Sequence, residues 1–85
     1  MLQIAAVLSE RRSRCVEAIG LNSQGIAVRF RVRGGGTAAY EYLFHGLTEA
    51  DYKDLADQAS LGAGGVLPLL VKQKPSRHAR GTFLP

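Results

Sequence analysis

Three arginines at alternating positions are the residues of this sequence best suited to chemistry. Residues 26–33 read Ile-Ala-Val-Arg-Phe-Arg-Val-Arg, so apolar and cationic side chains alternate. Successive side chains of a β-strand point to opposite faces, which predicts one oily face and one face that carries Arg29, Arg31 and Arg33. The guanidinium fork suits phosphate and carboxylate partners. The pattern therefore predicts a strand that presents a cationic row to water.

Two tyrosines in the next predicted strand determine what stands beside this row. If Tyr40 and Tyr42 share a face with the arginines, they form a platform on which unpaired bases can stack. A shift of one residue in strand pairing exchanges the two faces, and then Glu41 lies among the arginines while the tyrosines join the core. An unpaired carboxylate on the oily face is the larger cost. We therefore favour core tyrosines, and the aromatic platform stays the less favoured alternative.

The order of apolar, turn and capping residues predicts an α+β fold that positions these side chains. Three strands form an antiparallel meander, because turn residues and a run of glycines separate them. One amphipathic helix packs on the oily face and begins after Thr48, which forms a capping box with Asp51. The expected elements are an N-terminal strand (or helical turns) at 4–8, strands at 15–21, 26–33 and 38–44, the helix at 49–61 and a short C-terminal helix at 66–71.

The length and charge of the chain fit a single small domain. With 85 residues, of which 46% are hydrophobic, the chain is near the lower size limit for folding on one core. We expect an N-terminal strand and basic connector at 1–13, the α+β domain at 14–71 and a basic tail at 72–85. The net charge of +4 suits an anionic partner. Four cations of the tail would add sequence-blind attraction for phosphates: Lys72, Lys74, Arg77 and Arg80.

Cysteine content and hydropathy indicate a cytoplasmic protein without a membrane partner. Cys15 is the only cysteine, so neither an internal disulfide nor a site built from several thiolates can form. The apolar run at 2–8 is too short to span a bilayer. It also lacks the basic start and the cleavage site of a signal peptide.

No group of residues in the sequence has the spacing of a catalytic or metal site. His45 and His78 lie far apart, with no cysteine or carboxylate at ligand spacing, so we expect no metal. Ser60 caps or packs at the end of the helix, and Cys15 reads as a core residue beside Val16, so neither nucleophile has an evident base. We therefore expect a protein that is not an enzyme and that needs no cofactor.

From residue 14 to about residue 80 the chain resembles the KTSC domain, a small module found alone in bacterial proteins and at the C-terminus of some lysyl-tRNA synthetases. The likeness is carried by residues 16–21, 28–30 and 40–42, by Gly46, Leu47 and Tyr52, and by residues 59–62. The resemblance implies a small α+β fold and a role in RNA binding. The chain departs from the family after Gly62, where aromatic and Asn residues are replaced by Ala-Gly-Gly-Val, and in the glycine-rich loop before Tyr40.

These observations lead to two functional hypotheses from different classes. The first is a non-catalytic module that binds nucleic acid, RNA above all, electrostatically through the arginine face and the basic tail. The alternative is a protein-interaction or self-assembling module, in which the same cations meet carboxylates of a partner. The acidic face of the helix at 49–61 could supply those carboxylates from another copy, which predicts a homo-oligomer.

Overall fold

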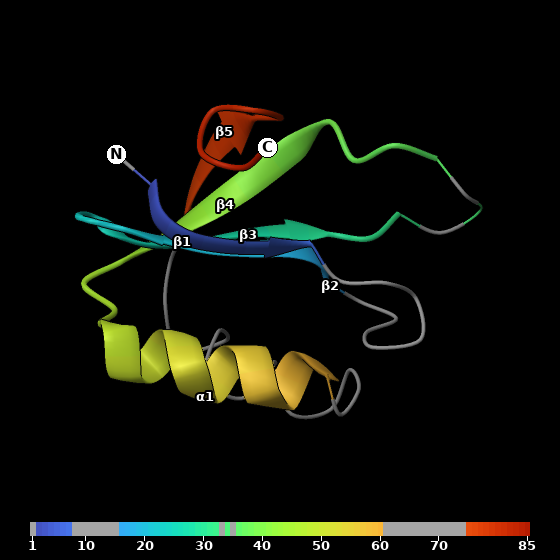
Figure 1. Ribbon diagram of the computed structural model, residues 1–85. Coiled ribbons are helices and arrows are strands. Elements are labelled where there is room, and N and C mark those ends of the chain that lie inside the picture. Colours follow the sequence, from blue (N-terminus) through green and yellow to red (C-terminus); the bar gives the residue numbers. More distant parts are fainter. Residues whose placement is uncertain (1, 8–15, 33, 35, 61–74) are drawn as a thin grey trace.

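The chain folds into one antiparallel sheet with a helix across one face, as a computed structural model shows (Figure 1). The structure describes residues 2–7, 16–32, 34, 36–60 and 75–85. Five strands follow one another in the sheet in chain order, each antiparallel to the next. The elements are β1 (Leu2–Val7), β2 (Val16–Asn22), β3 (Gly25–Phe30), β4 (Tyr40–His45), α1 (Glu49–Ser60) and β5 (Ser76–Ala79).

The main core lies between the sheet and α1 because apolar side chains alternate along the central strands. Ile26 and Val28 of β3 point to this side and pair with Leu21 and Ile19 of β2. The helix contributes the buried side chains of Tyr52 and Leu55, three positions apart on one stripe of α1. Figure 1 shows α1 lying across this face of the sheet. The expected amphipathic helix on an oily sheet face is confirmed.

The opposite face of the sheet, which we call the second face, is covered by the last residues of the chain. Leu84 is only 2% exposed and packs with Ala18, Ala27 and Leu43, and Phe83 lies against them. Figure 1 places the C-terminal segment and α1 on opposite sides of the sheet. Apolar side chains are therefore buried on both faces of the sheet.

The structure extends the predicted three-stranded meander at both ends. The favoured N-terminal strand is present as β1 and pairs with β2. Residues 76–79, which the sequence predicted as part of a basic tail, instead form β5 and pair with β4. The predicted short helix at 66–71 lies outside the described residues.

Local sequence signals set the start of α1 as predicted. The backbone N–H and the hydroxyl of Thr48 both donate to Asp51 Oδ2, at 2.9 and 3.0 Å. Asp51 and Glu49 also lie in the first helical turn, where the helix dipole favours negative charge. The helix runs to Ser60, and the predicted final residue, Leu61, lies outside the described residues.

The β2–β3 turn depends on a glycine. Asn22 Oδ1 accepts the N–H groups of Gln24 and Gly25 at 2.8 and 3.0 Å, which closes the turn. Gly25 has a φ of 150°, and a Cβ at this position would lie 2.1 Å from the carbonyl oxygen of Phe44. The close approach of β4 therefore requires glycine here.

Candidate nucleic-acid interface

Arg29 is a buried residue and does not belong to an exposed cationic row. Its side chain is 2% exposed and donates to Glu17 Oε2 at 3.1 Å and to Glu41 Oε2 at 3.0 Å. It also donates to the carbonyl oxygens of Leu84 and Pro85, both at 3.1 Å. The prediction that Arg29 faces water is wrong, because the C-terminal segment covers the second face. Two carboxylates of the same chain neutralise its charge there.

Glu41 accepts hydrogen bonds from Arg29 and from three backbone groups of the C-terminal segment. β3 and β4 pair at Val28 and Tyr42, so Glu41 lies on the face of Arg29, and the favoured strand register is confirmed. The fully buried carboxylate accepts the N–H groups of Gly81 and Leu84 at 3.1 Å and that of Phe83. The carboxylate thus fixes the C-terminal segment on the sheet.

The surroundings of Glu41 keep its carboxylate ionised. Burial alone would raise its pKa, but the N–H groups of Phe83 and Gly81, the Arg29 guanidinium and the N–H of Leu84 together lower the pKa below its usual value. His78 lies opposite Glu41 in the β4–β5 pairing, and Glu17 is the second carboxylate bound to Arg29. The charged form is therefore the one that the fold stabilises.

This lowered pKa predicts an acid-sensitive fold. The unfolded state binds the Glu41 proton more readily, so the stabilisation is complete above the unfolded pKa of about 4.5 and is lost as pH falls through the lower folded pKa. We expect the free energy of unfolding from urea titrations to decrease over this window. The variant Glu41→Gln should be less stable at neutral pH and should lose less on acidification. An equally steep decline in the variant would contradict this role of Glu41.

Two further arginines of the predicted interface have partners within the chain. β3 ends at Phe30, so Arg31 lies beyond the strand, half-buried, and its Nη2 donates to the carbonyl oxygen of Val16 at 3.2 Å. Arg80 Nη1 donates to Glu17 Oε2 at 3.0 Å and to the carbonyl oxygen of Ala38 at 3.2 Å. Both arginines therefore connect elements of the fold.

The remaining predicted contact residues lie partly on the surface that the structure describes and partly outside the described residues. Arg77, on β5, is exposed. Three predicted contact residues lie outside the described residues: Arg33, Lys72 and Lys74. Among the described cations, no continuous row follows β3.

The two tyrosines differ in their environments. Tyr42 is half-buried and packs against the main core, with its ring centroid 5.9 Å from that of Phe30. Tyr40 is 47% exposed, and the Arg77 guanidinium lies over its ring at 4.5 Å from the centroid. The prediction of core tyrosines is thus right for Tyr42 and wrong for Tyr40. The difference arises because β3–β4 pairing ends at Val28 and Tyr42, so no β3 residue pairs with Tyr40.

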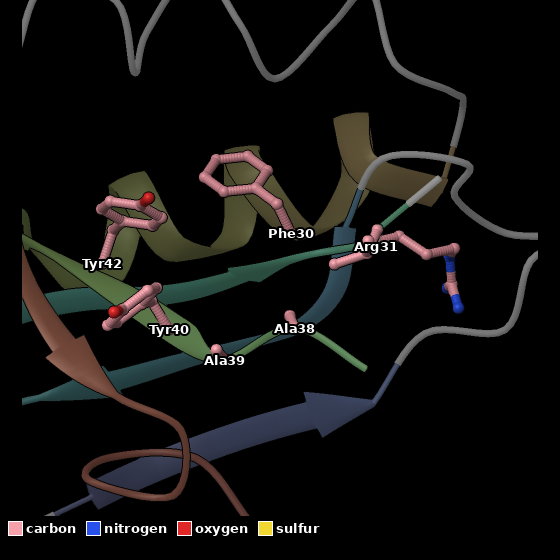
Figure 2. A pocket seen from close by; sticks show the side chains of 7 residues that line it. Phe30, Arg31, Ala38, Ala39, Tyr40 and Tyr42 are labelled. Carbon is pink, nitrogen blue, oxygen red and sulfur yellow. The ribbon is translucent and has the colours of Figure 1, made fainter. Parts of the chain in front are cut away.

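A pocket opens where β3 and β4 diverge, with a volume of about 170 Å³. Figure 2 shows the rings of Phe30, Tyr40 and Tyr42 beside one another at these strand ends, with the Arg31 side chain extending away from them. The lining residues are Phe30, Arg31, Val32, Ala38, Ala39, Tyr40 and Tyr42. Three aromatic rings and two alanines therefore give the pocket a flat, largely apolar lining.

The structure also brings together three polar side chains that the sequence did not connect. His45 Nε2 and His78 Nε2 lie 2.9 and 2.8 Å from the hydroxyl oxygen of Ser76. His45 and Ser76 are 31 residues apart in the chain. Alternation of His78 with Ser76 in a strand is the local signal that could have suggested their shared face.

No known family model, curated protein or solved structure matches this chain. The resemblance to the KTSC domain therefore stays a prediction. In the described part of the chain, no helix has both the length and the hydropathy needed to cross a membrane.

Proposed function

We propose that this chain is a non-catalytic module that binds unpaired bases of nucleic acid, RNA in the first place, at the pocket between the ends of β3 and β4. One observation carries the proposal: the exposed ring of Tyr40 lines an aromatic pocket and lies under the Arg77 guanidinium. Aromatic rings stack on bases of any sequence, and neighbouring arginines attract the phosphates between those bases.

The size and composition of the pocket support a flat, partly apolar ligand. A volume of about 170 Å³ and a lining of three aromatic rings and two alanines suit one planar ring system. Single-stranded loops and ends of RNA offer such rings without the cost of opening a duplex. The net charge of +4 adds a non-specific attraction for any polyanion.

The proposed contacts differ from those expected from the sequence. Arg77 replaces Arg29 as the principal cation, because Arg29 is occupied by Glu17 and Glu41. Tyr40 moves from the less favoured alternative to the central position. Arg31 also lines the pocket, but its Nη2 donates to the carbonyl oxygen of Val16, so Arg77 remains the principal cation.

The test is fluorescence anisotropy with a labelled single-stranded RNA at low and at physiological salt. Tyr40→Ala is expected to weaken binding by about 5- to 150-fold, because stacking on one aromatic ring contributes about 1–3 kcal/mol. Arg77→Ala is expected to weaken binding and to reduce the salt dependence by about one phosphate contact. Arg77→Lys should retain the salt dependence but lose affinity, since Lys lacks the planar guanidinium.

The matched control is Lys53→Ala, which removes an exposed cation from α1. This variant should bind RNA with nearly the affinity of the unmodified chain, because Lys53 does not line the pocket. The proposal would be overturned by two results: no measurable affinity for RNA in dilute buffer, or an affinity that Tyr40→Ala leaves unchanged.

A further inference from the structure

The cluster of His45, Ser76 and His78 lies on the second face, away from the aromatic pocket. Ser76 pairs with Leu43 in the β4–β5 register, and Leu43 packs with Leu84 on the second face. His78 follows Ser76 by two residues in β5, and His45 follows Leu43 by two residues in β4, so all these side chains point to the second face. Because the strands are antiparallel, the two histidines lie on opposite sides of Ser76. The cluster is thus independent of the proposed RNA site.

The hydrogen bonds of the cluster aim two imidazole nitrogens at one point. A serine hydroxyl has one proton, so it can donate to only one of the two Nε2 atoms. For both hydrogen bonds to form, the other Nε2 carries a proton and donates to Ser76 Oγ. The cluster therefore brings together two imidazole nitrogens, a type of atom that binds Zn²⁺ in proteins.

We propose that His45 and His78 bind a divalent first-row transition metal ion through their Nε2 atoms. Imidazole nitrogen is a preferred ligand for Zn²⁺, at about 2.0–2.1 Å. Both Nε2 atoms lie within hydrogen-bond distance of Ser76 Oγ, and rotation of the exposed His45 side chain would bring its Nε2 to an ion held by His78 beside Ser76. Among the described residues no group of three His, Cys, Asp or Glu side chains could hold a metal. Water and the Ser76 hydroxyl would therefore supply the remaining ligands.

The surroundings of His78 support this role. Its ring packs nearly perpendicular to that of Phe83, with centroids 4.7 Å apart and planes at 80°, which holds the imidazole in place. Glu41 lies opposite His78 in the register but accepts bonds from Arg29 and backbone N–H groups, so it is not a ligand.

The test is isothermal titration calorimetry of the untagged chain with ZnCl₂ near neutral pH, with imidazole NMR signals recorded in parallel. We expect saturable binding of Zn²⁺, with signals of both His45 and His78 shifting on addition of the metal. His45→Ala and His78→Gln should each weaken binding by at least about tenfold, because each removes one of two protein nitrogens. At about pH 5.5 binding should weaken, since protons compete for both imidazoles.

Two control variants separate this site from other zinc ligands. Cys15→Ser removes the only thiol and should leave binding unchanged, and Ser76→Ala should reduce it only a few-fold. Circular dichroism checks that each histidine variant is folded. The proposal is wrong if Zn²⁺ at about 1 mM gives no saturable binding, because the binding free energy is then weaker than about −4 kcal/mol. It is also wrong if the double histidine variant binds as tightly as the unmodified chain.

Discussion

Arg29→Met is expected to lower the free energy of unfolding by about 3–5 kcal/mol, because it leaves a buried carboxylate without its cation. Glu41 is fully buried, and Arg29 is the only cation bonded to it among the described residues. The substitution also removes the donors to the carbonyl oxygens of Leu84 and Pro85. Small domains have a free energy of unfolding of about 5–15 kcal/mol, so this loss is a large part of the total stability. Urea denaturation followed by circular dichroism measures it.

Two further variants show whether burial of the ion pair is the cause. Arg77→Met removes an exposed arginine and should cost about 0.5 kcal/mol or less. The double variant Arg29→Met, Glu41→Gln removes both charges and keeps an amide oxygen that accepts the backbone N–H groups. It should therefore have a higher free energy of unfolding than Arg29→Met alone. If Arg29→Met costs no more than Arg77→Met, then Arg29 is not buried in an ion pair.

The elements that the sequence predicted correctly depend on neighbours in the chain. Alternation of Ile26, Val28 and Phe30 predicts β3, because a strand places these side chains on one face. The Thr48–Asp51 capping box predicts the start of α1 for the same local reason. The strand register also followed from the sequence, since one buried, unpaired carboxylate outweighs every other difference between the two pairings.

The burial of Arg29 could not be predicted in this way. Its position on the second face was correct, but that face is closed by Leu84 and Pro85, which lie 55 and 56 residues away in the chain. An arginine on a half-exposed strand and one on a covered strand have the same local sequence. Only the folding back of the C-terminal segment distinguishes them.

The remaining differences between the sequence-based prediction and the structure depend on β5. Residues 76–79 read Ser-Arg-His-Ala, which has no apolar alternation to indicate a strand. Their pairing with β4 brings Arg77 over Tyr40 on one face. On the other face it places Ser76 between His45 and His78, within hydrogen-bond distance of both. Both candidate sites therefore arise from one polar edge strand, whose place in the sheet is set by tertiary contacts.

The packing of the C-terminal segment on the second face is expected to be sensitive to truncation of Leu84. Leu84→Ala should lower the free energy of unfolding by about 2–5 kcal/mol, because Leu84 is 2% exposed and packs with Ala18, Ala27 and Leu43. Urea denaturation gives the loss. Hydrogen exchange should show reduced protection of the Leu84 amide, since its bond to Glu41 depends on the same packing.

Val32→Ala is the matched control, since it shortens an aliphatic side chain that is 43% exposed. Its cost should be about 0.5 kcal/mol or less. Equal losses in the two variants would mean that Leu84 is not docked on the second face. Glu41 would then lack its backbone donors, and the acid sensitivity expected from its lowered pKa should also be absent. The two measurements thus test one arrangement, in which the C-terminal segment completes the surroundings of the buried ion pair.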